Sequence, residues 1–403
     1  MQRPLLIGLT LALMTSAAPS LAEEASAWRL FVADHSDPLV TALDVESGKT
    51  IGQFQLKGPA TLYATPSKGG VYAVQTESNQ VTAIATGIAI EDHGDHGDLK
   101  LGDPALIDVA LEGERPVHFV PHDGHLAIFF DGTGTAKLVH EDDWLEGEIE
   151  GHDFHTAAPH HGVAVQVGDH LVISEPNAAD PSALPVGVRV LDHDGKVVGA
   201  LHDCPDLHGE ASSGDTLAIA CAAGLLLVKQ AAAGPSIELL PYSADLPEGK
   251  STTLLGGVGL QYFLGNYGAD KVVIVEPGAE AAFRLVNLPT RRVHFAVDPQ
   301  RVRFAYVFTE DGNLHELDVV DGAITRSLKL TEPYSMDGEW SLPRPRIAVA
   351  GGDIAVTDPL KGLIHIVHAE DFELESDIAL DGKPFNIVAV GGSGEDHGHH
   401  HHH

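Results

Sequence analysis

A repeat of roughly 40 to 58 residues runs through the chain and constrains its fold more than any other feature. Each unit opens with a short apolar strand, passes a turn, continues through two β-rich strands and closes with a more polar one. Residues 162–191 and 347–367 show the pattern plainly, each with a Gly-Asp turn after the first strand. Repeats of this length are typical of β-propeller blades, each of which is a four-stranded sheet.

Eight units can be counted from their first strands, which start near Leu62, His118, His161, His208, Leu254, His294, Ile347 and Ile387. No strands follow the last of these, whereas the chain after residue 22 begins with three strands that lack a first one. Joining the two ends completes a blade and leaves no open sheet edge. We therefore predict an all-β fold, an eight-bladed β-propeller closed by pairing of the N- and C-terminal strands. Seven blades is the alternative if one unit is an insertion.

The two ends of the chain are expected to lie outside this domain. Residues 1–22 carry one positive charge, an apolar run and then small residues, which is the pattern of a secretory signal peptide. Residues 392–403 form a flexible tail that ends in an expression tag of five histidines. The single propeller domain is predicted to cover residues 23–391, in the periplasm, and no segment is long enough to insert into a membrane.

Charge and cysteine content narrow the partners and the compartment. The chain has 24 Lys and Arg against 58 Asp and Glu, a formal charge of −34. Such a charge repels nucleic acid and anionic lipid and favours cations and basic protein surfaces. The only two cysteines are Cys204 and Cys221, which we expect to form a disulfide in an oxidising compartment. A thiolate metal site is the alternative.

Histidines recur where the predicted blades begin. Aligning the first strands places four of them at one equivalent position beside the central channel: His118, His161, His208 and His294. The first three belong to consecutive blades, so their imidazoles could meet on one metal ion, with a carboxylate or water as the fourth ligand. Glu210 and Asp206 are candidates for that fourth position.

The alternative is that each of these histidines is structural and hydrogen-bonds the backbone of a neighbouring blade. Further histidines nearby in the sequence favour the metal site: His122, His125, His152, His155 and His160. Imidazole suits Zn²⁺, and also Cu²⁺ and Ni²⁺. We predict that His118, His161 and His208 are metal ligands, and that the metal is Zn²⁺.

A second set of possible ligands lies in residues 91–98, Glu-Asp-His-Gly-Asp-His-Gly-Asp. The glycines and charges predict a mobile loop. His93 and His96 alternate with carboxylates and so supply nitrogen and oxygen ligands for a borderline divalent cation. We expect this loop to bind metal weakly and exchange it fast. A solvated acidic turn is the alternative.

Signatures of the common catalytic classes are absent: there is no G-x-S-x-G, P-loop, H-E-x-x-H or C-x-x-C. A three-histidine zinc with an open position could still activate water, so a zinc-dependent hydrolase of the lactonase type is one alternative. A protein-interaction propeller with incidental histidines is another. Aromatic residues make up only 6% of the chain and give no sign of a substrate pocket. We predict that the protein is not an enzyme.

The acidic, exported propeller, its motif at residues 93–96 and its histidines at 118, 161 and 208 together resemble the AztD family of periplasmic zinc metallochaperones. The resemblance spans essentially the whole chain after the signal peptide. It implies a propeller fold, zinc binding and a protein partner, because that family accompanies a zinc ABC importer and passes Zn²⁺ directly to its solute-binding protein. We accordingly expect a monomer that captures Zn²⁺ and transfers it by stepwise ligand exchange.

Overall fold

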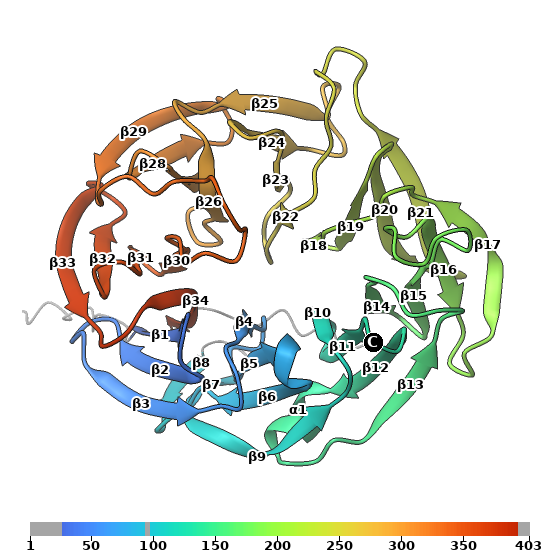
Figure 1. The fold of residues 1–403 in the computed structure, drawn as a ribbon, viewed down its shortest axis with the longest axis horizontal. Helices are drawn as coiled ribbons and strands as arrows, with labels where there is room; N and C mark the ends of the chain where they lie inside the picture. The colour runs from blue at the N-terminus through green and yellow to red at the C-terminus, as the bar shows by residue number, and fades with distance from the viewer. Residues whose placement is uncertain (1–25, 93–96, 394–403) are drawn as a thin grey trace, which may run out of the picture.

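The computed structural model describes residues 26–92 and 97–393, which form a ring of eight four-stranded antiparallel sheets (Figure 1). Each sheet is one blade, and its strands pair in order from the centre of the ring outward. The prediction of an all-β propeller with eight blades is confirmed. Residues 1–22, His93, His96 and the C-terminal tag lie outside the described residues.

Blades 1 to 4 make up the first half of the ring, and the innermost strand of each is named first. Blade 1 contains β34 (Pro384–Ser393), β1 (Ser26–Asp34), β2 (Leu39–Asp44) and β3 (Thr50–Gln55). Blade 2 contains β4 (Thr61–Ala64), β5 (Gly70–Gln75), β6 (Gln80–Ala85) and β9 (Ala105–Glu112), with the short helix η1 (Thr76–Ser78) and the inserted hairpin β7 (Ile88–Asp92) and β8 (Gly97–Leu101). Blade 3 contains β10 (Pro116–His122), β11 (His125–Phe130), β12 (Thr135–His140) and β13 (Gly151–His155), with α1 (Glu141–Leu145) before β13. Blade 4 contains β14 (Ala164–Val167), β15 (His170–Glu175), β16 (Gly187–Leu191) and β17 (Val197–Asp203).

The other four blades complete the ring in the same order. Blade 5 contains β18 (Glu210–Ser213), β19 (Thr216–Cys221), β20 (Gly224–Ala231) and β21 (Gly234–Pro241). Blade 6 contains β22 (Leu254–Leu255), β23 (Phe263–Asn266), β24 (Lys271–Val275) and β25 (Phe283–Asn287). Blade 7 contains β26 (Arg292–Val297), β27 (Phe304–Thr309), β28 (Asn313–Asp318) and β29 (Ala323–Lys329). Blade 8 contains β30 (Ile347–Ala350), β31 (Asp353–Asp358), β32 (Leu363–His368) and β33 (Glu373–Ala379).

Both ends of the chain contribute to blade 1, as predicted. The C-terminal strand β34 pairs with β1, placing Ala389 opposite Leu30 and Val388 opposite Phe31. The innermost strand of this blade therefore comes from the C-terminus and the other three from the N-terminus. This pairing joins the first and last blades, so the ring has no open sheet edge.

The core consists of eight apolar clusters, each formed mainly by two neighbouring blades of the described chain. Second strands such as β5 and β19 are buried along their whole length because a blade packs against each of their faces. The outermost strand β33 is almost entirely exposed. The contrast between apolar second strands and more polar outermost strands thus follows from their distance to the surface of the ring.

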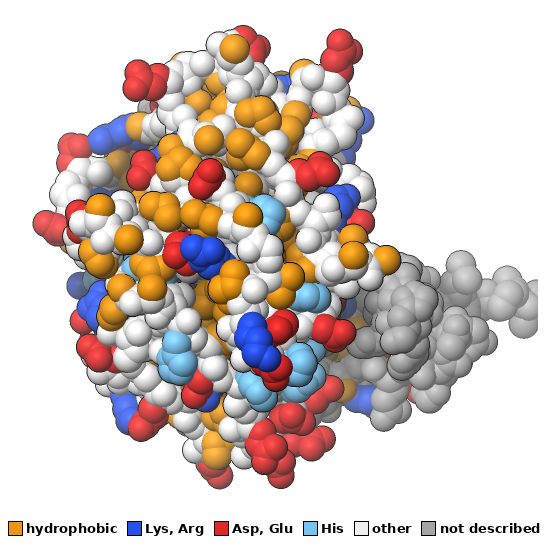
Figure 2. Space-filling view, turned by 90° about the vertical axis from the view of Figure 1, so that its right-hand side faces the viewer, with side chains coloured by type: hydrophobic (Ala, Val, Ile, Leu, Met, Phe, Trp, Pro, Cys, Tyr) orange, Lys and Arg blue, Asp and Glu red, His pale blue; other side chains and the backbone are white. Residues whose placement is uncertain are grey.

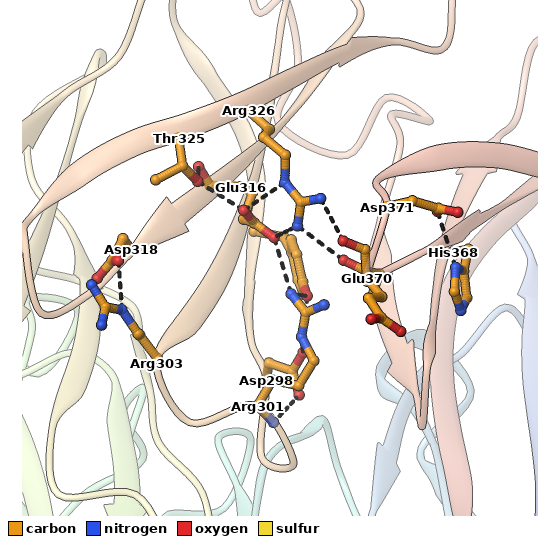
Figure 3. Close-up of polar contacts among 12 residues, drawn as sticks. Asp298, Arg301, Arg303, Glu316, Asp318, Thr325, Arg326, His368, Glu370 and Asp371 are labelled. Carbon is orange, nitrogen blue, oxygen red and sulfur yellow. Dashed lines mark hydrogen bonds and ion pairs between the residues drawn. The ribbon is translucent and has the colours of Figure 1, made fainter.

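Blades 7 and 8 are also joined by a buried polar network (Figure 3). The Glu316 carboxylate, 2% exposed, accepts hydrogen bonds from Arg326 and from Arg301 at 3.0 Å. Arg326 in turn donates to the carbonyl oxygens of Ala369 and Glu370 in blade 8. Burial alone would raise the pKa of Glu316, but the hydrogen bonds from Arg326 outweigh it and lower the pKa.

Blade 8 contains a buried histidine between two carboxylates. His365 Nδ1 lies 2.6 Å from Asp377, and its Nε2 lies 3.4 Å from Asp358. Burial lowers the pKa of His365, but the hydrogen bonds to Asp358 and Asp377 raise it by more, so the net shift is upward. His365 and the two carboxylates thus form a structural contact within one blade.

Cys204 and Cys221 form a disulfide, with their Cα atoms 5.3 Å apart, which confirms the predicted pairing. It ties the loop before β18 to the end of β19. Across the described ranges, no helix combines the length and apolar character needed to cross a membrane.

Candidate metal centre

The histidines of three consecutive blades meet where their inner strands begin. His118 lies on β10, His161 precedes β14 and His208 precedes β18. The ring centres of His118 and His161 are 4.8 Å apart, those of His161 and His208 are 5.1 Å apart, and those of His118 and His208 are 6.2 Å apart. The structure thus brings the three predicted residues together, and we call them the histidine trio.

Their positions along the strands differ from the predicted alignment. His118 and His294 are equivalent, because each follows a β-bulge and pairs with the penultimate residue of the next strand, Phe129 or Phe308. In blades 4 and 5 the equivalent residues are Val163 and Gly209. The carbonyl oxygen of Val163 accepts a hydrogen bond from the penultimate residue of β15, and that of Gly209 accepts one from the penultimate residue of β19. The prediction of one equivalent position is therefore wrong for His161 and His208. His161 and His208 lie in the loops before β14 and β18, and these loops bring their imidazoles close to that of His118.

Each imidazole of the trio is held through its Nδ1 atom. His118 Nδ1 lies 3.1 Å from Glu210 Oε1, His161 Nδ1 lies 2.7 Å from Asp131 Oδ2, and His208 Nδ1 lies 2.8 Å from the carbonyl oxygen of Thr252. Carboxylate and carbonyl oxygens only accept, so Nδ1 donates in all three contacts. In the neutral imidazoles the lone pair is then on Nε2, which is the pattern that outer-shell partners impose on metal-binding histidines.

The free nitrogens of two members face each other. His118 Nε2 and His161 Nε2 are 3.3 Å apart, which brings two lone pairs together when both rings are neutral. A shared cation or proton stabilises such an arrangement. Within the described part of the chain, no group of three or more His, Cys, Asp or Glu side chains is arranged so that it could hold a metal ion without a change in position. The trio approaches that geometry, and the wide spacing of His118 and His208 is its largest departure.

Glu210, the first residue of β18, gives the centre a buried negative charge. It reaches across blade 4 to His118 of blade 3, and its Oε2 atom is buried without a hydrogen-bond partner. Burial would raise the pKa of Glu210, but the charge and hydrogen bond of His118 outweigh it and lower the pKa. For His118, burial lowers the pKa and Glu210 raises it by more, with a net upward shift. The pKa of Tyr63 is raised as well, mainly by burial and to a smaller extent by the negative charge of Glu210.

The local sequence around His208 explains its position. Gly209 has φ +86°, and a Cβ atom there would lie 2.5 Å from the carbonyl oxygen of Thr252. Glycine therefore allows the chain to turn and to approach blade 6, whose Thr252 holds His208. The disulfide of Cys204 lies four residues before His208, and the His208 amide donates to Ala220 beside Cys221. The loop is thus fixed on both sides of the imidazole.

His294 differs from the trio in its hydrogen bonding. Its Nδ1 accepts from the backbone amide of Ile347 at 3.1 Å, so in the neutral ring the proton is on Nε2. Burial, together with the charges of Arg346 and Arg292, lowers the pKa of His294 well below its ordinary value. This histidine fits the structural alternative, a side chain that joins the inner strands of blades 7 and 8.

The other residues that the sequence suggested do not surround the trio. His122 and His125 flank the turn at the far end of β10, and His152 and His155 lie on the outermost strand of blade 3. His160 is buried beside Ser174 Oγ, 2.8 Å from its Nε2. Asp206 lies 3.2 Å from Lys250 at the surface and is not part of the centre. The expectation that these histidines lie around the site is therefore wrong for His122, His125, His152 and His155, whereas His160 lies next to His161 and is held by Ser174.

Asp131 and Thr252 are residues of the centre that the sequence did not reveal. Asp131 follows the end of β11 and belongs to the blade before His161, while Thr252 belongs to the blade after His208. A carboxylate directly after the second strand, one blade before a histidine loop, is the signal that could have identified Asp131. For Thr252 there is no such signal, because only its backbone carbonyl is used.

No family model matches the chain. The curated zinc chaperone AztD of Citrobacter koseri is 50% identical over 395 residues, which cover 98% of this chain and 94% of that protein. A crystal structure of Citrobacter koseri AztD has a TM-score of 0.90 at 50% identity and covers 93% of this chain and 100% of that one. The structure of apo AztD from the same organism gives a TM-score of 0.89 at 49% identity, covering 92% and 99% of the two chains. The dihydro-heme d1 dehydrogenase NirN in complex with DHE shares the fold alone, with a TM-score of 0.55 at 13% identity over 94% of this chain and 77% of that one.

Proposed function

This chain belongs to the AztD family of zinc chaperones, and from that premise we propose that it binds Zn²⁺ at the histidine trio and delivers the ion to another protein. The observation that carries the proposal is the common orientation of the trio. Three imidazoles from three blades have Nδ1 fixed by an acceptor, and two of them place Nε2 atoms face to face. A structural role for each histidine does not require this orientation.

The spacing within the trio supports a single tetrahedral ion. Zn–N bonds of about 2.0–2.1 Å at a tetrahedral angle place two ligand nitrogens about 3.3–3.4 Å apart. The Nε2 atoms of His118 and His161 are 3.3 Å apart. Allowing about 1.1 Å from nitrogen to ring centre, two imidazoles on one zinc have centres about 5.2 Å apart. Two observed spacings, 4.8 and 5.1 Å, are close to this value, and the third, 6.2 Å, closes with a movement of about 1 Å of His208 toward His118.

The carboxylates of the centre have a supporting role in this proposal. Glu210 contacts the Nδ1 side of His118 and Asp131 contacts the Nδ1 side of His161, so each orients a ligand and raises its basicity. The unpartnered Oε2 atom of Glu210 adds negative potential next to a bound cation. We assign the fourth coordination position to water, or to a donor atom of the receiving protein.

An open fourth position is also what transfer requires. The His161 side chain is 32% exposed, compared with 16% for His118. An incoming donor would therefore reach the zinc on the His161 side, and His161 would be the first imidazole replaced. We propose that the recipient is the periplasmic solute-binding protein of a zinc ABC importer. Stepwise exchange of ligands then moves the ion without releasing it to solution.

His93 and His96 keep their proposed role as a capture device. They lie outside the described residues, between the strands β7 and β8 that are inserted in blade 2 between its third and outermost strands. Alternating imidazole and carboxylate groups on such a hairpin would bind Zn²⁺ weakly and release it quickly. The chain would carry out these steps in the periplasm, after removal of residues 1–22.

The test uses protein from which the five terminal histidines have been cleaved, because they bind metal themselves. Zinc content is measured by mass spectrometry, and the zinc-loaded protein is then mixed with the apo solute-binding protein and separated from it. We expect His118→Asn and His161→Asn to abolish tight zinc binding, while the control His294→Asn retains it. Zinc that stays with the His118→Asn variant would contradict the site. Zinc that never reaches the partner would contradict the delivery step.

A further inference from the structure

A long loop with an exposed tryptophan joins the outermost strand of blade 7 to the innermost strand of blade 8. It covers residues 330–346, between β29 and β30, and we call it the Trp340 loop. Trp340 is 86% exposed, the largest value among the large apolar residues of the described ranges. Leu342 of the same loop is 45% exposed. Tryptophan is highly buried on average in folded proteins, so this exposure requires an explanation.

The Trp340 loop is folded around the buried side chain of Arg344, which is 4% exposed. The guanidinium donates at 2.9–3.3 Å to four backbone carbonyl oxygens of the loop, those of Ser335, Asp337, Glu339 and Trp340. One buried cation thus closes the loop on itself and fixes the backbone of Trp340, while the indole lies in solvent.

Two further contacts fasten the Trp340 loop to neighbouring blades. Asp337 lies 2.8 Å from Arg291, which directly precedes the innermost strand of blade 7. The carbonyl oxygen of Ser341 accepts a hydrogen bond at 2.7 Å from Nε2 of His35, in the turn after β1 of blade 1. The loop therefore presents its indole on a fixed backbone. An aromatic side chain held in this way loses little conformational entropy when it binds a partner.

The Trp340 loop ends at the mouth of the ring where the histidine trio lies. The loop leads into the innermost strand β30, just as the segments with His161 and His208 lead into the innermost strands β14 and β18. Figure 1 shows the segment between β29 and β30 running from the outer part of the ring toward its centre. A protein that takes zinc from the trio has to lie over this mouth. A typical interface covers about 800 Å² on each partner and so reaches the loops of several blades.

The charges of the Trp340 loop favour a basic partner. Its exposed charged residues are all acidic: Glu332, Asp337 and Glu339. Arg344 is buried inside the loop, and Arg346 packs against the ring of Phe385. The whole chain has a formal charge of −34, and Figure 2 shows acidic side chains spread over one flank of the ring with fewer basic ones among them. An apolar anchor in acidic surroundings fits an apolar pocket that is rimmed by Lys and Arg.

We infer that the Trp340 loop is a docking element for the protein that receives zinc from the trio, with Trp340 as the apolar anchor and Glu339 in the acidic rim beside it. The inference rests on the proposed function, because the recipient is the protein that has to cover this mouth. Docking at the loop holds the recipient over the trio during ligand exchange and adds no ligand to the zinc. The loop therefore determines how tightly the recipient binds, and the trio determines how tightly the zinc is held.

The experiment measures binding of the zinc-loaded full chain, freed of its terminal histidines, to the apo periplasmic solute-binding protein of a zinc ABC importer. Surface plasmon resonance gives the affinity and the association rate, and mass spectrometry of the separated proteins gives the zinc transferred. The loop variants are Trp340→Ala and Glu339→Gln. Their matched controls, Leu239→Ala and Glu238→Gln, change an exposed pair of the same kind on the outermost strand of blade 5. Thermal unfolding and a zinc titration establish that each variant is folded and that its trio is intact.

We expect Trp340→Ala to weaken binding of the recipient at least about 30-fold, the loss typical of an interface hot spot, with zinc affinity unchanged. Trp340→Phe should recover part of the lost binding. Zinc transfer from Trp340→Ala should be slow at low concentrations of the recipient and approach the wild-type rate when the recipient is saturating. Glu339→Gln should slow association and lessen its dependence on salt.

Recipient binding that is unchanged in Trp340→Ala, or weakened as much in Leu239→Ala, would overturn the inference and leave the proposed function intact. Loss of zinc binding in Trp340→Ala would also overturn it, because the loop would then have a structural role. A wild-type dimer that Trp340→Ala disperses, detected by light scattering, would show that a second copy covers the loop instead. Failure of the wild-type chain to bind the recipient or to load it with zinc would refute the proposed function as well.

Discussion

Asp131→Asn is the substitution that most directly tests how the histidine trio is prepared for metal. Asp131 Oδ2 accepts from His161 Nδ1 at 2.7 Å, while its Oδ1 accepts from the Gly162 amide at 3.4 Å. Asparagine has only one oxygen, so keeping the bond from Gly162 turns its NH₂ group toward His161. The proton of the neutral imidazole then moves to Nε2, the atom that should bind zinc. The substitution therefore favours the wrong tautomer with almost no change in volume.

The expected loss is that of an outer-shell partner, about 10- to 100-fold in zinc affinity, or about 1.4–2.7 kcal/mol. Competition titration against a chelator of known affinity measures it. The matched control is Asp371→Asn, because Asp371 also accepts from a histidine Nδ1, that of His368 at 3.0 Å, but on the outer part of blade 8. Asp131→Asn with wild-type affinity, or an equal loss in the control, would refute the reasoning.

Three further predictions concern stability, each measured by urea unfolding. Replacing Cys204 and Cys221 by serine removes a link across 17 residues and should lower the free energy of unfolding by about 3 kcal/mol; an unchanged value would show that the reduced loop is held by other contacts. Glu316→Gln should lower the free energy of unfolding by about 2–3 kcal/mol, because it removes the negative charge that pairs with Arg301 and Arg326. The loss is limited because both arginines keep some solvent access, and a loss under about 0.5 kcal/mol would contradict this. The pKa of His365 is raised, so its contribution to stability is complete below the unfolded value of about 6.5 and is lost as pH rises through the folded pKa. The difference in stability between wild type and His365→Gln should therefore shrink as pH rises above about 6.5, and a constant difference would contradict the ion pair.

The fold could be predicted from the sequence because its periodicity has a simple physical cause. A second strand such as β19 is buried on both faces and is mostly apolar, while an outer strand such as β33 is mostly exposed and carries more polar residues. This gradient repeats in every blade and is readable without knowing any contact. The pairing of β34 with β1 followed from counting strands. The C-terminus has a first strand with no strands after it, and the N-terminus has three strands that lack a first one.

The site could be predicted only in part, because side-chain position depends on details finer than the period. Proximity of His118, His161 and His208 followed from three consecutive blades. Their exact alignment did not, because a bulge precedes His118 and the other two histidines lie in loops. Closeness in sequence was also a poor guide. His122 is four residues from His118 yet lies at the opposite end of the strand.

His294 shows why the hydrogen bond at Nδ1, and not the position in the blade, decides whether a histidine can bind metal. His294 is the true structural equivalent of His118, since both follow a bulge and pair with the same position of the next strand. At His118 the partner is an acceptor, Glu210, which leaves Nε2 free, whereas at His294 the partner is a donor, the Ile347 amide. The nearby charges differ in the same sense, because Glu210 favours a cation at His118 and two arginines disfavour one at His294. The same position is therefore a proposed metal ligand in blade 3 and a structural contact in blade 7, and the group that meets Nδ1 makes the difference.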